Sequence, residues 1–200
     1  MFSKDLYEKQ QFDSIGCEDA VFENKIFRNC SFKSCSFSSS VFRGCTFEKC
    51  TFYGVKFNGA EFVRTAFLNC KISFCSLFTA VYSNCKMTGS YFSDCDFATV
   101  EIDSGDWSYT GLCYADFAGK TIENVNFSNA DLQRADFSKA RLRRCNFTDS
   151  VLSNASFASA DIRDNTFNGI DVKTVNLKNA YIDLNLAVVI AECHGARCFY

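Results

Sequence analysis

Residues 30–52 read CSFKSCSFSSSVFRGCTFEKCTF, and this stretch places a phenylalanine at every fifth position. The same phase continues in both directions along the chain. From Phe22 to Ile182 every residue whose number ends in 2 or 7 is large and apolar, which makes 33 successive five-residue units without a slip. The residue two places before each of them is usually small, most often Cys, Ala or Ser. The sequence is therefore one continuous array of pentads.

A period of five fits neither the 3.6-residue period of a helix nor the two-residue period of a free-standing strand. It fits a four-sided coil in which each pentad forms one side and the chain turns at each corner. The large residue and the small residue two places before it then both point inward, because alternate residues of an extended segment share a face. One turn takes twenty residues, and residues twenty apart stack at about 4.8 Å.

The units Ala130-Asp131-Leu132-Gln133-Arg134 and Ala160-Asp161-Ile162-Arg163-Asp164 resemble the Ala-Asp/Asn-Leu/Phe-x-x signature of pentapeptide-repeat proteins. The resemblance implies an all-β fold, a right-handed quadrilateral β-helix, here of about nine coils. Residues 1–183 are predicted to form this β-helix, with residues 1–11 as an irregular N-terminal cap. Residues 184–200 leave the five-residue period and are predicted to form a C-terminal cap or dimerisation segment.

Composition supports a repetitive solenoid and narrows the functional classes. The 200 residues include 23 Phe, 13 Cys and no Pro, and a ladder of backbone hydrogen bonds excludes Pro because Pro has no N–H to donate. A net charge of -2 argues against direct nucleic-acid binding, which needs clustered basic residues. No apolar run is long enough to span a membrane, and the start of the chain lacks the apolar core of a signal peptide. We expect a cytoplasmic protein.

Cysteine use does not indicate a metal or disulfide site. Nine of the thirteen cysteines occupy the small inward position, where they alternate with Ala and Ser, so we expect small buried side chains there. Cys193, His194 and Cys198 do not have the spacing of a common zinc site. The chain has one His and no phosphate-binding glycine pattern. We therefore expect no cofactor, no metal and no enzymatic activity.

Two stretches depart from the pattern. Lys120 and Asn165 fall in the inward small position, where an unpaired polar group is costly, so we expect a local bulge or a lysine stem that reaches out to solvent. The tail abandons the pentad period and is rich in apolar residues. Its candidate cap or dimer residues are Leu184, Leu186, Val188, Val189 and Ile190. A monomeric cap and a homodimer through this end both remain open.

Acidic residues form the one surface pattern that suggests a binding site. Asp96, Asp116 and Asp136 lie twenty residues apart and are expected to stack in one column. Further acidic residues continue this surface on an adjoining side: Glu101, Asp103, Glu123 and Asp161. A fold that keeps like charges stacked in one column indicates either that the carboxylates are fully exposed to solvent or that their negative potential serves in binding. Repeat consensus alone also accounts for it, because Asp is common at this place in the pentad.

The array resembles the Qnr and MfpA quinolone-resistance types of the family. These resemble a segment of B-form DNA in width and charge, and they bind DNA gyrase and topoisomerase IV. The resemblance implies a non-enzymatic DNA mimic that gives quinolone or toxin protection, with the acidic columns as the contact. A net charge of -2 is weak for a DNA mimic. The alternative is an interaction scaffold or effector module whose protein partner is unrelated to DNA enzymes.

Overall fold

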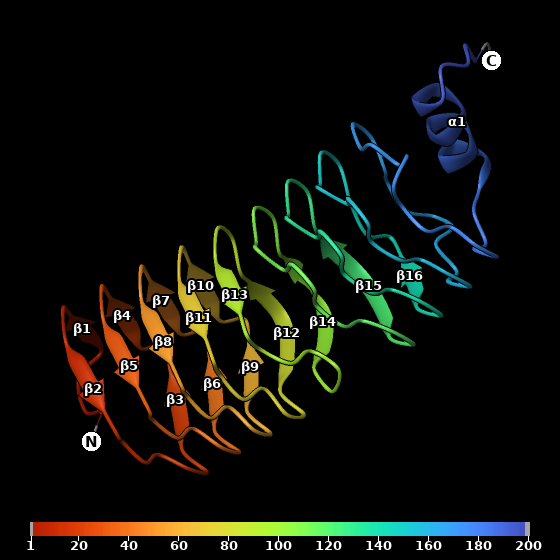
Figure 1. Ribbon diagram of the computed structural model, residues 1–200. Helices are drawn as coiled ribbons and strands as arrows, with labels where there is room; N and C mark the ends of the chain where they lie inside the picture. Colours follow the sequence, from red (N-terminus) through yellow and green to blue (C-terminus); the bar gives the residue numbers. More distant parts are fainter. Residues whose placement is uncertain (1, 199–200) are drawn as a thin grey trace.

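The computed structural model describes residues 2–198, which form a rod of stacked coils with the N-terminus at one end and a single helix at the other (Figure 1). The strands are β1 (Leu6–Glu8), β2 (Gln11–Asp13), β3 (Val21–Glu23), β4 (Ile26–Arg28), β5 (Ser31–Lys33), β6 (Val41–Arg43), β7 (Thr46–Glu48), β8 (Thr51–Tyr53), β9 (Glu61–Val63), β10 (Ala66–Leu68), β11 (Lys71–Ser73), β12 (Val81–Lys86), β13 (Tyr91–Ser93), β14 (Glu101–Asp106), β15 (Thr121–Asn126) and β16 (Arg141–Arg143), and the helix is α1 (Leu184–Cys193).

All strand pairs are parallel, and each residue pairs with the one twenty positions later. β1 pairs with β4 through Tyr7↔Phe27, and β4 pairs with β7 through Phe27↔Phe47. One sheet of eleven strands contains the path β1-β4-β7-β10-β12-β14-β15-β16, and a second sheet has the order β13-β11-β8-β5-β2. The four-sided β-helix predicted from the pentads, with the right-handedness that the family resemblance implies, is therefore the fold of the chain.

The strand ladder makes about seven turns, slightly fewer than the nine predicted. It runs from β1 at Leu6 to β16 at Arg141. Beyond β16 the chain keeps the same spacing only through isolated bridges, which end at Asp161↔Tyr181. The prediction counted every twenty residues of chain, including these bridged coils at the C-terminal end.

The N-terminal coil is more regular than predicted. Within residues 1–11, expected to be irregular, β1 already pairs in register with β4, and β2 starts at Gln11. Phe2 lies across the open end of the coil, and its ring is 5.1 to 6.4 Å from five others, those of Tyr7, Phe12, Phe22, Phe27 and Phe37. An open solenoid end exposes apolar side chains, and this ring covers them. Residues 1, 199 and 200 of the predicted terminal segments lie outside the described residues.

The corners explain the polar residues of each pentad. At most positions of the rod whose number ends in 4 or 9 the backbone φ is positive, for example +52° at both Asn24 and Asn29; Thr99 and Thr174 are exceptions. Asn, Asp and Gly tolerate this left-handed conformation best, which accounts for their frequency there. Gly105 is a separate case, because it sits in an inward position with φ +125°. A Cβ on Gly105 would lie 2.2 Å from the carbonyl oxygen of Cys85, so only glycine fits between these two coils.

Aromatic rings fill the axis of the rod in columns, as the pentads predicted. The ring centroids of Phe27 and Phe47 are 4.9 Å apart with planes 8° from parallel, and Phe147 and Phe167 stack in the same way. Rings on neighbouring sides of one coil meet edge to face, as Phe27 and Phe32 do at 5.5 Å and 71°. Both arrangements are favourable for aromatic quadrupoles. The core is thus held by two kinds of ring contact, one along the axis and one around it.

Truncation of one stacked ring should destabilise the rod strongly. Phe47 is 1% exposed and stacks between Phe27 and Phe67. We expect Phe47→Ala to lower the free energy of unfolding by about 3 to 5 kcal/mol because it leaves a cavity between two rings. Urea denaturation followed by circular dichroism measures this change. Arg43→Ala, at an exposed position of β6, is the control and should cost less than about 0.5 kcal/mol. Equal costs for both variants would contradict the stacked core.

Candidate functional site

Turn geometry accounts for the acidic column of Asp96, Asp116 and Asp136. Each carboxylate accepts a hydrogen bond from the backbone N–H two residues later, with distances of 2.8 Å to Ala98, 2.9 Å to Ala118 and 2.8 Å to Ser138. Asn126 and Asn146 accept the same bond from Ser128 and Thr148. Local bonds of this type are the reason that Asp and Asn are favoured in turns. These three aspartates therefore have a structural task that the repeat itself requires.

The column is also interrupted at Asp96. Asp116 and Asp136 form a parallel bridge, as predicted for stacked residues. Among the bridges of residues 2–198, none joins Asp96 to the residue above or below it. The stacking expected between Asp96 and Asp116 is therefore not formed by the backbone ladder.

A second group of carboxylates surrounds a surface hollow of about 680 Å³. Glu101 and Asp103 lie on β14 and Glu123 lies on β15, and all three side chains line the hollow together with Lys120. Asp103 and Glu123 are direct partners in the ladder, which is an unfavourable placement for like charges. Among the described hydrogen bonds, no side-chain oxygen of these three residues caps a turn. Glu123 accepts from Nη2 of Arg144 at 3.1 Å in an exposed ion pair, whereas the described residues give Glu101 and Asp103 no ion-pair partner. Turn geometry does not require the three carboxylates, so they are better candidates for a binding role than the turn-capping aspartates.

The hollow exists because two oversized residues occupy adjacent places in one inward column. The column reads Ala60, Ala80, Val100, Lys120, Ala140, Ala160 in successive coils. Val100 is fully buried, and the stem of Lys120 starts directly above it and leaves the core. The Nζ of Lys120 donates to the carbonyl oxygen of Ala98 at 2.8 Å. Of the two alternatives expected at Lys120, the stem that reaches out of the core is confirmed.

The pKa of Lys120 reflects the carboxylates that lie near its ammonium group. Burial lowers the pKa of Lys120, and the negative charges of Asp116, Glu101 and Asp96 act in the opposite direction. The ammonium group thus sits between the column of turn-capping aspartates and the acids of the hollow. A cationic side chain is already accommodated at this place.

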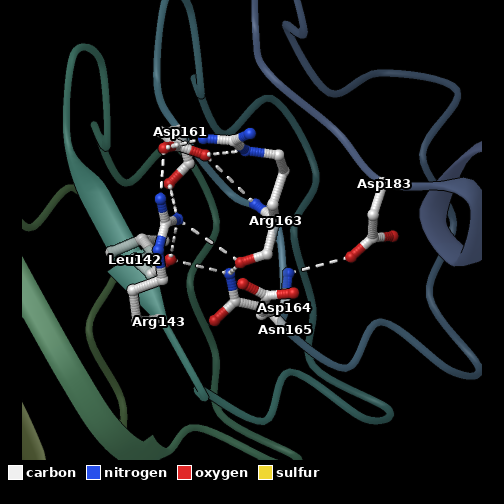
Figure 2. Close-up of polar contacts among 7 residues, drawn as sticks. All are labelled: Leu142, Arg143, Asp161, Arg163, Asp164, Asn165 and Asp183. Atoms are coloured by element: carbon white, nitrogen blue, oxygen red, sulfur yellow. Dashed lines mark hydrogen bonds and ion pairs between the residues drawn. The ribbon is translucent and has the colours of Figure 1, made fainter.

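Asp161, the last of the predicted acidic residues, is neutralised by two arginines (Figure 2). Arg163 Nε donates to its carboxylate at 2.9 Å, and Arg143 Nη2 donates to the same group. These arginines, Arg163 more strongly, hold the pKa of Asp161 well below its usual value. Arg143 also donates to the carbonyl oxygen of Leu142 at 2.9 Å. The structure therefore places Asp161 in a fixed ion-pair network, separate from the acidic hollow.

Asn165 is buried without a polar penalty because its amide satisfies three backbone groups. Its Nδ2 donates to the carbonyl oxygens of Leu142 and Arg163, both at 3.0 Å (Figure 2). Its Oδ1 accepts from the N–H of Cys145 at 2.8 Å. The local bulge expected at this position is not required. The bond to Leu142 spans 23 residues, and this spacing recurs throughout the rod.

The inward cysteines follow the same rule, which the sequence analysis missed. Each thiol donates to the carbonyl oxygen of the residue 23 positions earlier, at 3.2 to 3.7 Å. The donors are Cys30, Cys35, Cys45, Cys50, Cys70, Cys75, Cys85, Cys95 and Cys145. Ser40, Thr65, Ser90 and Thr110 make the same bond with their hydroxyl groups. These small residues are therefore hydrogen-bond donors as well as fillers, and the recurrence of Ser and Thr in the column was the signal for it.

Comparisons with known proteins agree with this geometry. A family model described as pentapeptide repeat region matches residues 120–185, and a model of the SV2A/B/C luminal domain matches residues 1–74. Trypsin-treated QnrB1, a plasmid-mediated fluoroquinolone resistance protein, is similar in structure with a TM-score of 0.74, at 21% identity over 97% of both chains. The fold is that of a pentapeptide-repeat protein. No curated protein matches the sequence.

A more distant structural match is a second pentapeptide-repeat protein, HetL, involved in heterocyst differentiation regulation in the cyanobacterium Nostoc sp. strain PCC 7120. Its TM-score is 0.35 at 14% identity, over 91% of this chain and 90% of HetL, and no argument rests on it.

Helix α1 closes the C-terminal end of the rod. Asp183 caps the helix by accepting from the N–H of Leu186 at 3.0 Å, and its other oxygen accepts from the N–H of Asp164 at 2.8 Å (Figure 2). Leu186 is buried against the last coil, whereas Leu184 is 79% exposed. Cys193 on the helix donates to the carbonyl oxygen of Ile170, again 23 residues earlier. The helix therefore docks in the register of an additional coil.

Beside α1 lies a second hollow, of about 900 Å³, lined by Phe167, Leu184, Leu186, Val188 and Val189 among others. Ile190, the last predicted tail residue, is half-buried and packs against the core. Over residues 2–198 no helix is long and apolar enough to cross a membrane, and no group of three or more His, Cys, Asp or Glu residues is placed to hold a metal ion.

Buried thiols should make the rod sensitive to alkaline pH. Burial raises the pKa of Cys85 to about 12 and that of Cys145 to about 11, from an ordinary value of 9.0. Above pH 9 the unfolded chain loses these protons while the folded chain keeps them, so the stabilisation falls as the pH rises from 9 towards 12. The urea concentration at the midpoint of unfolding, measured at about pH 8 and at about pH 10.5, reports this loss of stability, because the two pH values lie below and above the ordinary thiol pKa of 9.0.

The double variant Cys85→Ser, Cys145→Ser is the matched comparison, because a hydroxyl keeps the hydrogen bond to the earlier carbonyl and does not titrate in this range. Its loss of stability between the two pH values should be smaller than that of the wild type. An identical loss would show that these thiols are already ionised, or exposed, in the folded protein.

Proposed function

We propose that this chain is a non-enzymatic rod that binds a type II topoisomerase, DNA gyrase or topoisomerase IV, and thereby gives protection from quinolones or toxins. The observation that supports this most is the likeness in fold to QnrB1, a fluoroquinolone resistance protein, over 97% of both chains. Such a partner acts in the cytoplasm, which we propose as the location of this protein. At 21% identity the likeness supports the partner class through shape, and the charge pattern supplies the second support.

The acidic hollow is the part of the surface that we assign to the topoisomerase. Asp103 and Glu123 are paired in the ladder although their charges repel, and among the described residues only Glu123 of the two has an ion-pair partner, Arg144, at 3.1 Å. Asp96 and Asp116 lie on the adjoining side and, with Glu101, face the Lys120 ammonium. Rows of carboxylates at strand spacing produce a local negative field even where the net charge of the chain is only -2. A surface that normally contacts DNA phosphates would recognise such a field.

A second candidate function, an interaction scaffold unrelated to DNA enzymes, is favoured by a different surface. Tyr53, Phe74, Tyr91 and Tyr114 are each about half or more exposed, and they follow the side of the rod that contains β8, β11 and β13. The rings of Tyr53 and Phe74 contact each other edge to face at 5.4 Å. Exposed aromatic side chains are enriched in protein interfaces. On this side of the rod a partner protein would make apolar contacts, whereas at the acidic hollow it would make charged contacts.

A gyrase assay separates these two functions. We expect the wild-type protein at micromolar concentration to alter supercoiling by DNA gyrase or its quinolone-induced cleavage, and the effect to weaken with added salt. The double variant Asp103→Lys, Glu123→Lys should lose most of the effect because it reverses the field at the hollow. Glu23→Lys reverses an exposed charge of the same column at the far end of the rod and should retain activity. A flat response to the wild type would remove the topoisomerase proposal.

We also propose that two rods join through the C-terminal end. The exposed Leu184 and the hollow beside α1 provide apolar surface that a second copy would cover. Light scattering should give the mass of two chains for the wild type and of one chain for Leu184→Asp. Ser153→Asp places the same charge on an exposed residue that does not line this hollow and should leave the mass unchanged. A single-chain mass for the wild type would refute the dimer.

A further inference from the structure

The dipeptide Asn-Gly occurs twice in the chain, at the same place in two different pentads. It is found at Asn58-Gly59 and at Asn168-Gly169, and each asparagine directly follows an inward phenylalanine. Each glycine lies at the next corner, with φ +64° at Gly59 and +70° at Gly169. The two sites therefore share their local sequence and their backbone turn, so a difference in reactivity between them comes from their surroundings.

The N–H of Gly169 has lost the partner that its column normally provides. At the corners of this column each N–H donates to a carbonyl oxygen of the following coil, as Asp149 does to Asn168 at 2.9 Å. No regular coil follows Gly169, because the chain enters α1 at Leu184. Among residues 2–198 no backbone carbonyl accepts from the N–H of Gly169. The column of corner bonds therefore ends one residue before this glycine.

The other site is held by the coil that follows it. The N–H of Gly59 donates to the carbonyl oxygen of Phe78 at 2.8 Å. The Oγ of Ser76 donates to the Oδ1 of Asn58, which is half-buried. Asn168 and Gly169, by contrast, are both exposed to solvent. One Asn-Gly site is thus fixed through its backbone and its side chain, and the backbone of the other is free at the nitrogen that matters for the chemistry below.

An asparagine that precedes glycine can close a succinimide ring on its own backbone. The glycine amide nitrogen forms a bond to Cγ of the asparagine, the Cγ–Nδ2 bond breaks, and Nδ2 leaves as ammonia with the proton of the amide. Water then opens the ring at either carbonyl and gives aspartate or isoaspartate. The amide nitrogen has to turn towards Cγ, and glycine allows this turn most easily. A hydrogen bond from the same N–H to another coil opposes it.

We propose that Asn168 is a site of spontaneous conversion to aspartate and isoaspartate in the folded protein, and that the following coil protects Asn58. Asn168 lines the hollow beside α1, which Glu192 also lines. Conversion therefore adds a second carboxylate to this hollow, where like charges repel. The proposal goes beyond the proposed function and does not depend on which partner the rod binds.

The two sites can be compared within one sample. The full-length protein is incubated at mildly alkaline pH and digested at acidic pH, and mass spectrometry of the peptides gives the converted fraction at each asparagine over time. We expect conversion at Asn168 to be at least about tenfold faster than at Asn58, because the bonded coil has to open locally before Asn58 reacts. In urea, where neither site is held, the two rates should be similar.

Two variants identify the group that controls the reaction. Asn168→Gln keeps the amide but requires a larger ring, so conversion at this position should be lost while the rate at Asn58 stays the same. Ser76→Ala removes the bond to the Asn58 side chain and leaves the bond from the N–H of Gly59 to Phe78. Asn58 should remain slow in this variant, because the nitrogen that attacks is still held.

Equal rates at the two sites in the folded protein would overturn the proposal. An intact Asn168 over a time in which the urea-unfolded chain converts would also overturn it. Faster conversion at Asn168 in urea as well would assign the difference to the residues that follow each glycine, and fast conversion of Asn58 in Ser76→Ala would assign the protection to the side chain. Both results reject the role of the free N–H. No topoisomerase takes part in these measurements, so their outcome and that of the supercoiling assay are independent.

Discussion

The rod depends on a hydrogen bond between the small inward residue of each pentad and the carbonyl group 23 positions earlier, at the level of the preceding coil. Thiols, hydroxyls and one amide make this bond in place of one another, as Cys70, Ser90 and Asn165 show. The bond ties each coil to the one below at the wall, while the rings along the axis supply most of the buried apolar area. Where the small residue is alanine, the backbone ladder alone keeps the coils together. A valine in this column does not by itself open the ladder, since Val55 is fully buried and its carbonyl oxygen still accepts from the N–H of Ser76 at 3.0 Å.

Most of the fold was predictable because the pentad period leaves few geometries open. Thirty-three units in phase fix which side chains face the axis, and the stacking of Phe27 on Phe47 follows from a twenty-residue turn. The handedness came from family resemblance. The regular first coil was missed because Cys17 underfills its position, although Phe2, Tyr7 and Phe12 are all in phase with the inward-facing residues. The docking of α1 was also hidden, since Cys193 lies outside the repeat and only the structure shows its bond to Ile170.

The acidic residues of the candidate site could be predicted from the sequence, but the role of each carboxylate could not. The seven acidic residues were visible, but three of them cap turns and Asp161 is held by two arginines, tasks that depend on local geometry. What remains is Glu101, Asp103 and Glu123 around the hollow, of which Glu123 is paired with Arg144. Lys120 was recognised as an exception, yet the hollow is lined by both Lys120 and Val100, its neighbour in the same inward column. The sequence analysis considered Lys120 alone and did not consider that two residues larger than alanine, Val100 and Lys120, follow each other in one inward column.

The constant offset of twenty residues between bridged partners has a consequence for how such a chain changes over evolutionary time. Duplication or excision of one whole turn preserves every contact on either side of the junction, since each coil meets its neighbours through equivalent atoms. Both ends, the Phe2 ring and the terminal helix, would be carried along unaltered. Length is therefore a quantised property of this molecule, adjustable in single steps of the strand spacing, whereas the position of an irregular coil relative to the two ends is set separately.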